Sequence, residues 1–201
     1  MGLVIEDLVV ALEAGGVVGM PTDTVYGLIA RATDPAAARR LFELKGRSDD
    51  VPLAVLCATV DQALDLSAMA EDPAVVAVAG RWWPGPLTLV LPRRAGVELH
   101  LGEPVATIGL RVPDDARVRA LAARVGPLAA TSANRHGEPV AVTAEEVREA
   151  LGGGLAAVLD GGRLGARSST VIDATGSPWR VLRDGPLDAA EIFATARDAA
   201  G

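Results

Sequence analysis

The chain is poor in the residues on which several kinds of site depend. Its 201 residues include one cysteine, two histidines, three Trp, one Tyr and two Phe. A single cysteine excludes a disulfide or a thiolate metal cluster within one chain, and two histidines are too few for a histidine-rich metal site. Cys57 lies in the apolar run LAVLCA and is expected to be a buried, inert thiol. With so few aromatic rings, Val, Leu and Ala must build the interior.

Positive charge is also scarce. The chain has 19 Lys and Arg against 26 Asp and Glu, a formal net charge of −7, which argues against binding of nucleic acid through a broad basic surface. No apolar run approaches the length of a membrane span, and the N-terminal MGLVIED lacks the basic start of a signal peptide. We therefore expect a cytoplasmic protein with no membrane contact.

What the sequence does contain is a series of well-marked helix and strand signals. Asp34 and Pro35 are typical of a helix start and Gly46 of its end, and Thr143 with Glu146 forms a capping box. Helices are expected at 3–14, 35–45, 72–83, 114–126 and 143–154, and from about 187. Strands are expected at 17–22, 52–57, 87–92, 105–112, 127–133, 156–160, 169–173 and 179–183.

These elements predict the fold class. Strands and helices mix without the strict alternation of a doubly wound fold, so we expect an α/β protein with a mixed sheet and helices around it. No repeat, low-complexity segment or linker interrupts the chain, which predicts a single domain over residues 1–201.

Polar clusters follow several of the predicted strands. Taken singly, each is typical of a helix cap or a turn, but together their hydroxyl and guanidinium groups suit a polyphosphate and a small polar acid. Without a paired-carboxylate spacing or a Ser-His-Asp arrangement, such a site would work by positioning and charge neutralisation. The clusters are Thr22-Asp23-Thr24 with Tyr26, Lys45 with Arg47, Thr107 with Arg111, Thr131-Ser132-Ala133-Asn134, and Ser168-Ser169-Thr170 with Arg183.

One stretch, GGRLGARSS from Gly161, is close to a P-loop motif. Ala166 and Arg167 replace the required glycine and lysine, and a predicted strand follows where a P-loop needs a helix. We interpret this stretch as a glycine-rich connection that turns Ser169 and Thr170 toward the site.

Six longer blocks resemble the YrdC/Sua5 family when read in order. They are PTDTVYGL, KGR, RWWPGPLTLVL, TIGLRVP, TSANRHGEP and SSTVID...VLRDG, spread over about residues 15–187. The chain is similar to the short form of the family, without the C-terminal Sua5 domain. The resemblance implies a twisted open sheet with flanking helices and a concave ligand groove.

The family activity implied by the resemblance joins L-threonine, bicarbonate or carbon dioxide, and ATP. It yields threonylcarbamoyl-AMP and pyrophosphate, the first step toward the N6-threonylcarbamoyladenosine base of tRNA. Mg²⁺ would accompany ATP without protein side chains as metal ligands. The implied partners are the small substrates and a downstream tRNA threonylcarbamoyl transferase, with tRNA contact weak or indirect.

The resemblance also implies residue roles, two of them catalytic, namely those of Lys45 and Arg47. The ATP-binding positions would be Lys45, Arg47, Thr107, Ser132, Asn134 and Arg183. The threonine-binding positions would be Thr24, Tyr26, Arg111 and Ser169, with Tyr26 lining the pocket and the choice between Ser168 and Ser169 left open. Our own reading of residue types pairs Arg111 with the threonine carboxylate.

The chain departs from the pattern of its relatives at four positions, and two other functions remain open. Ser48, Val51 and Leu56 stand where relatives have a proline, an asparagine and a threonine-binding histidine. At a fourth position, Val140 replaces a serine that some relatives have after the S-x-N element. One alternative is an RNA-binding module, and another is an enzyme that forms a carbamoyl-adenylate from carbamoyl phosphate. His136 is expected to be a solvent-facing loop residue.

Overall fold

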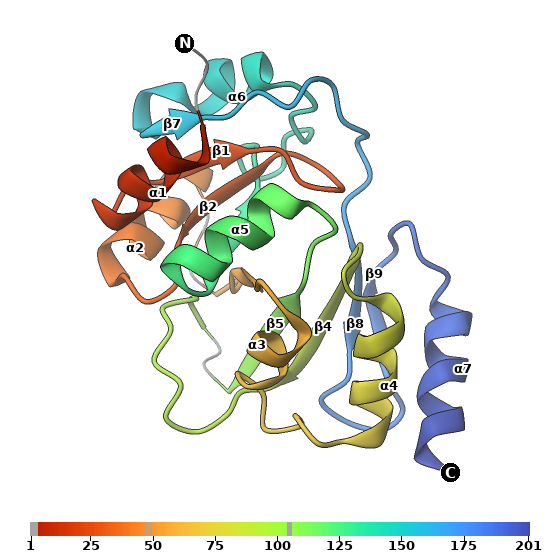
Figure 1. Cartoon of the computed structure of the whole chain (residues 1–201). Coiled ribbons are helices and arrows are strands. Elements are labelled where there is room, and N and C mark those ends of the chain that lie inside the picture. Colours follow the sequence, from red (N-terminus) through yellow and green to blue (C-terminus); the bar gives the residue numbers. More distant parts are fainter. Residues whose placement is uncertain (1–3, 47, 49, 104–105) are drawn as a thin grey trace.

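The computed structural model describes residues 4–46, 48, 50–103 and 106–201 (Figure 1). The helices are α1 Ile5–Glu13, α2 Pro35–Lys45, α3 Val60–Leu64, α4 Pro73–Trp82, α5 Ala116–Val125, α6 Ala144–Leu151 and α7 Ala189–Ala200, with the 3-10 turn η1 Gly152–Gly154. The strands are β1 Val18–Met20, β2 Gly27–Arg31, β3 Ala54–Leu56, β4 Leu87–Pro92, β5 Thr107–Arg111, β6 Leu128–Ser132, β7 Ala157–Val158, β8 Thr170–Asp173 and β9 Arg180–Arg183.

Within these described ranges the strands form one mixed sheet in the order β7-β1-β2-β6-β3-β5-β4-β8-β9. The pairs β1–β7, β3–β5 and β4–β8 are parallel, and the other neighbours are antiparallel. In Figure 1, β1 and β2 run at a steep angle to β4 and β8, as the right-handed twist of a large sheet requires. The predicted mixed α/β sheet is confirmed.

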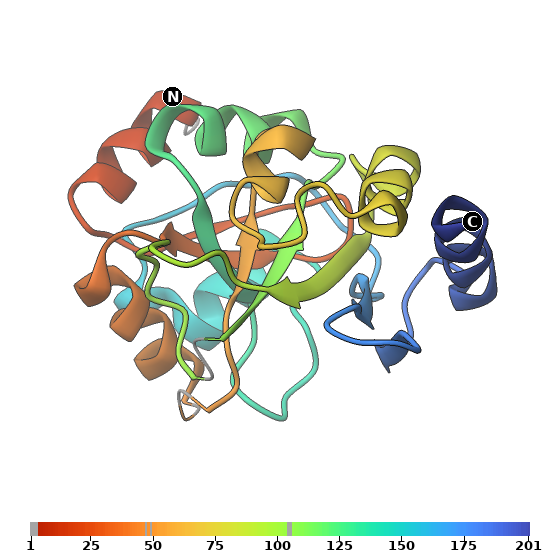
Figure 2. The same ribbon diagram turned by 90° about the horizontal axis from the view of Figure 1, so that it is seen from below.

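Helices pack on the sheet through two apolar clusters. The smaller cluster joins α1 and α5 to β1, β2 and β6, with Leu8, Leu121 and Leu128 fully buried. The larger one includes α2, α4, α6 and α7. Figure 2 shows α4 and α7 side by side at one end of the molecule and α1 near α5.

Capping side chains set the bounds of α2, which positions part of the site. The Asp34 carboxylate accepts hydrogen bonds from the backbone N–H groups of Ala36 and Ala37, at 2.9 and 3.1 Å. At the other end Gly46 adopts a left-handed conformation, φ 63°, that favours glycine. Lys45 is therefore the last residue of α2, at a defined height above the sheet.

Three elements differ from the sequence-based expectation. Strand β2 was not predicted, because its GLIAR sequence is short and directly follows a polar loop; it lies inside the sheet between β1 and β6. The short helix α3 was also not predicted. Helix α6 ends at Leu151, and Gly152–Gly154 form the 3-10 turn η1 instead, because glycine has a low α-helix propensity.

Candidate active site

One face of the sheet forms the floor of a cavity of about 550 Å³. Successive side chains of a strand point to opposite faces, and on β3, β4 and β5 the lining residues are spaced two apart. Strands β6 and β9 also contribute consecutive residues. The strand residues that line the cavity are Gly27 from β2, Ala130, Thr131 and Ser132 from β6, Ala54 and Leu56 from β3, Thr107, Gly109 and Arg111 from β5, Thr88 and Val90 from β4, Val171 from β8, and Leu182 and Arg183 from β9. Glycine and alanine on four neighbouring strands leave the space that larger side chains would fill.

The cavity is lined by cations without acidic neighbours at its surface. Lys45, Arg111 and Arg183 line it, and no Asp or Glu is found among the lining residues that the structure describes. This is unusual for a chain with a net charge of −7. A cleft lined by positive charges raises the local concentration of anions. The cavity is therefore suited to an anionic ligand.

Lys45 lies at the end of the cavity formed by α2 and the loop after β6. Its ammonium donates to the carbonyl of Ser132 at 2.7 Å, to the Ser132 hydroxyl at 2.9 Å and to Asn134 Oδ1 at 2.5 Å. The Asn134 amide in turn donates to the carbonyls of Arg135 and Glu138. Lys45 is the only lysine of the chain and is 4% exposed. This network holds one positive charge against the loop at the cavity wall.

Arg111 occupies the other end of the cavity, held on three sides. Its Nε donates to the carbonyl of Gly85 at 3.0 Å, Nη1 to Thr24 Oγ1 at 3.0 Å, and Nη2 to Asp23 Oδ1 at 2.6 Å. Burial lowers the pKa of the Arg111 guanidinium, and the neighbouring Asp23 carboxylate acts in the opposite direction. The remaining N–H groups of the guanidinium stay available to a carboxylate in the cavity.

The turn that carries Asp23 and Thr24 is fastened by a hydroxyl. Thr22 Oγ1 accepts from the N–H groups of Thr24 and Val25, at 3.1 and 3.3 Å, and donates to the carbonyl of Val25 at 2.7 Å. This local turn, typical of Ser and Thr, keeps the two side chains aimed at Arg111.

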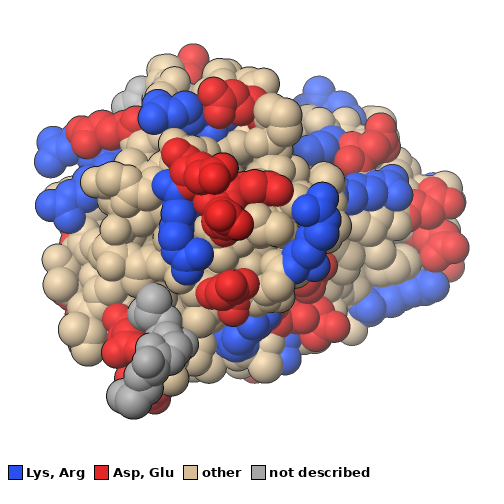
Figure 3. Space-filling model, turned by 90° about the horizontal axis from the view of Figure 1, so that it is seen from above, with Lys and Arg blue, Asp and Glu red and all other residues tan. Residues whose placement is uncertain are grey.

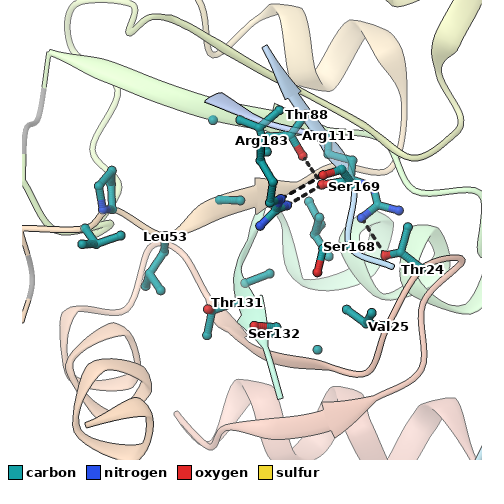
Figure 4. A pocket seen from close by; sticks show the side chains of 18 of the residues that line it. Thr24, Val25, Leu53, Thr88, Arg111, Thr131, Ser132, Ser168, Ser169 and Arg183 are labelled. Carbon is teal, nitrogen blue, oxygen red and sulfur yellow. Dashed lines mark hydrogen bonds between the residues drawn. The ribbon is translucent and has the colours of Figure 1, made fainter. Parts of the chain in front are cut away.

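A third group of polar residues joins β4, β8 and β9 (Figure 4). Arg183 donates through Nε to the carbonyl of Ser169 and through Nη2 to its hydroxyl, both at 2.9 Å. The Ser169 hydroxyl is 2.9 Å from Thr88 Oγ1. Burial lowers the pKa of Arg183, and the positive charge of nearby Arg111 lowers it further. Two guanidinium groups therefore face the same end of the cavity.

The chain is similar to proteins of one family over most of its length. The family model for Sua5, YciO and YrdC proteins, described as "Telomere recombination", matches residues 10–185. The chain belongs to this family. A putative threonylcarbamoyl-AMP synthase of Mycobacterium tuberculosis is 39% identical over 183 residues, covering 90% of this chain and 84% of the relative.

One archaeal relative extends well beyond the region that this chain matches. The threonylcarbamoyl-AMP synthase of Pyrococcus abyssi is 39% identical over 90% of this chain, which spans 54% of that protein. The structure of P. abyssi Sua5 complexed with L-threonine matches with a TM-score of 0.85 at 37% identity, over 95% of this chain and 56% of that one. The Sua5-type fold expected from the sequence blocks is thus confirmed.

The structure brings most of the sequence-predicted site residues of this Sua5-family chain into one cavity. Those that line it are Thr24, Lys45, Thr107, Arg111, Ser132, Asn134, Ser169 and Arg183. Arg47 lies outside the described residues. Ser168 also lines the cavity, and its hydroxyl has no hydrogen-bond partner among the described residues, whereas that of Ser169 bonds to Thr88 and Arg183.

Tyr26 corrects one expectation, since it is fully buried and does not line the cavity. Its phenol donates to the carbonyl of Gly162 at 2.8 Å and accepts from the N–H of Gly161 at 3.0 Å. It therefore fastens the glycine-rich connection before β8. His136 differs in the other direction, because it is exposed as expected yet also lines the cavity.

Sequence reasoning missed Thr88 altogether. In LTLVLP a single threonine among apolar residues has the appearance of an ordinary β-branched strand residue. The only available signal was spacing: Thr88 lies two residues before Val90 on β4, so both side chains point to the sheet face that lines the cavity.

Cys57 is buried as expected, and strand β8 follows the stretch that resembles a P-loop. Of the two residues expected to turn toward the site, Ser169 lines the cavity, but Thr170 does not. Thr170 is buried, and its hydroxyl bonds to the carbonyl and the N–H of Leu187.

Residues 4–46, 48, 50–103 and 106–201 contain neither a cluster of metal-ligating side chains nor a membrane-spanning helix. Among those residues no group of three or more His, Cys, Asp or Glu is placed to hold a metal ion. None of the helices described there has the length and apolar character needed to cross a membrane.

Proposed function

We propose that this chain is an L-threonylcarbamoyl-AMP synthase, which converts L-threonine, bicarbonate or carbon dioxide, and ATP to threonylcarbamoyl-AMP and pyrophosphate. The observation that carries the proposal is the cavity, whose charged lining consists of Lys45, Arg111 and Arg183 with hydroxyl and amide donors between them. A carboxylate and a triphosphate both need such donors. The relatives of this name support the same reaction.

The two ends of the cavity would take different parts of the substrates. At one end Arg111, with Thr24 beside it, would bind the carboxylate of L-threonine through paired N–H donors. At the other end the positive charge of Lys45 would attract the phosphates. Its three ammonium hydrogens go to the carbonyl and hydroxyl of Ser132 and to Asn134 Oδ1, so phosphate oxygens would replace some of these acceptors when ATP binds. Arg183 and Ser169 lie at the Arg111 end, and Thr107 on the cavity floor completes the set.

The reaction then follows from positioning. The amino group of threonine takes up bicarbonate with loss of water and becomes a carbamate. A carbamate oxygen attacks the α-phosphorus of ATP, the bond from that phosphorus to the bridging oxygen breaks, and pyrophosphate leaves with its electron pair. Preorganised donors aimed at developing negative charge lower such a barrier, and removal of one donor from an oxyanion site raises it by about 3–4 kcal/mol.

Mg²⁺ fits the site as a companion of ATP rather than as a resident ion. The described lining residues include no carboxylate, so phosphate oxygens would hold the metal. When bound, it neutralises phosphate charge. We also propose that the protein works in the cytoplasm and passes its product to a tRNA threonylcarbamoyl transferase.

The alternative functions receive less support from the described surface. Figure 3 shows one face of the molecule, on which Lys and Arg alternate with Asp and Glu instead of forming a continuous basic surface. A backbone-binding RNA module needs such a surface. The carbamoyl phosphate route would use the same phosphate-binding cations, and only the substrate requirement distinguishes it.

The test is pyrophosphate release from ATP and Mg²⁺ with L-threonine or bicarbonate omitted in turn. Release that needs both supports the synthase, and release driven by carbamoyl phosphate without threonine would refute it. Arg183→Ala should lower kcat/KM by about 100-fold. Arg180→Ala is the matched control, because this arginine of the same strand β9 pairs with Asp173 outside the cavity.

Arg111→Ala separates the two ends of the cavity. It should raise the KM for threonine far more than the KM for ATP, because Arg111 is placed at the carboxylate end. Equal increases in the two KM values would show that the assignment of the ends is wrong.

A further inference from the structure

The Thr88 and Ser169 hydroxyls form a buried pair whose hydrogen count leaves one donor unused. The two oxygens are 2.9 Å apart and the residues are 5% and 4% exposed. Two hydroxyl groups supply two hydrogens, and one of these lies between the oxygens. Within the described part of the chain neither hydroxyl has another acceptor. The second hydrogen must therefore point into the cavity that both residues line.

Arg183 decides which hydroxyl carries that free hydrogen. Its Nη2 donates to Ser169 Oγ at 2.9 Å, and its Nε holds the Ser169 carbonyl at the same distance. An oxygen that accepts from a cation becomes a stronger donor itself, because hydrogen bonds in a chain polarise one another. The favoured order runs from Arg183 to Ser169 to Thr88, which leaves the Thr88 hydroxyl as the donor to the cavity.

The position of Thr88 indicates what it meets there. Leu89 pairs with Leu110 across β4 and β5, so Thr88 and Arg111 occupy the next positions along these strands, on the sheet face that floors the cavity. Figure 4 shows the Thr88 hydroxyl directed toward Ser169, close to the Arg111 side chain. An oxyanion bound by Arg111 would thus lie within reach of this donor.

We propose that Thr88 is a substrate-binding residue whose hydroxyl donates a hydrogen bond to a planar oxyanion, either the carboxylate of L-threonine or the carbonate that is joined to it. The inference deepens the proposed function and rests on it. Both sources present the same chemistry, trigonal oxygens with in-plane lone pairs. Phosphate binding is assigned to the opposite end of the cavity, around Lys45.

Thr88→Val tests the proposal, because valine keeps the shape and removes only the hydroxyl. We expect the KM for threonine or for bicarbonate to rise about tenfold or more, as for a lost hydrogen bond to a charged group, with the KM for ATP changed less than about twofold. The substrate whose KM rises identifies the oxyanion. Thr88→Ser keeps the donor and should restore most of the affinity.

Three other results would overturn the proposal. They are unchanged KM values in Thr88→Val, an equal rise in the KM for ATP, and a rise in Ser169→Ala with none in Thr88→Val, which would place the donor on Ser169. Thermal melting of each variant shows whether the fold is kept. Wild-type protein that releases pyrophosphate without threonine would refute the proposed function itself, a result independent of every Thr88 variant.

Discussion

Replacing Asp23 with Ala is expected to cost about 3 kcal/mol of folding free energy, the low end for breaking a buried ion pair by removing one partner. Asp23 Oδ1 is 2.6 Å from Arg111 Nη2, and the side chains are 12% and 7% exposed. Loss of the carboxylate leaves a buried guanidinium beside that of Arg183. The bonds from Arg111 to Gly85 and Thr24 remain, which keeps the cost near the lower limit.

Thermal unfolding measures this cost, because about 3 kcal/mol lowers the Tm of a protein of this size by about 6–12 °C. Asp114→Ala is the matched control. Its ion pair with Arg119 spans 3.3 Å, but the Asp114 side chain is 69% exposed, so its loss should cost less than about 1 kcal/mol. Equal Tm shifts in the two variants would refute the reasoning that burial makes the Asp23 pair the stronger one.

Three further predictions concern acid stability, thiol reactivity and the cavity floor. The hydrogen bond from Thr175, with that from Arg180, keeps the pKa of Asp173 below its ordinary value despite burial. Asp173→Asn should therefore be less stable than wild type at pH 7 by about 1–2 kcal/mol. Denaturant melts should begin to converge below about pH 4, where the unfolded state is protonated, and should meet only below the lowered pKa of the folded state. Burial raises the pKa of Cys57 to about 12, so a thiol reagent should label the native protein only after denaturant is added; rapid native labelling would contradict this. A Cβ on Gly109 would lie 3.6 Å from Thr88 Cγ2, an ordinary contact, so Gly109→Leu should fold. Its side chain would fill the cavity and lower kcat/KM by about 100-fold or more. Full activity of this variant would show that the cavity is not the site.

Local signals in the sequence were sufficient for most elements. Helix α2 begins and ends where Asp34, Pro35 and Gly46 predicted, because caps act within one turn of the backbone. Strand β2 escaped prediction because nothing local distinguishes GLIAR. Its place is decided by pairing with β1 and β6, and β6 lies about 100 residues further along the chain.

The two errors at the site arise from the same limit. Tyr26 is next to the site in sequence, yet its phenol bonds to Gly161 and Gly162, and a difference of 135 residues separates it from the first of these. Thr88 resembles a core residue in sequence and lies on the cavity floor. Which way a strand side chain points depends on the register with its neighbours, and non-local pairing fixes that register.

The sequence by itself determined the chemistry of this protein: which polar residues it offers, that they follow strands, and which family they resemble. Composition and local spacing carry that information. Only the tertiary structure decided that five strands of one sheet place glycine, alanine and threonine in the cavity beside Lys45, Arg111 and Arg183. It also decided that Asp23 is bonded to Arg111 instead of lining the cavity. These relations join segments far apart in the chain, and they exist only once the sheet has formed.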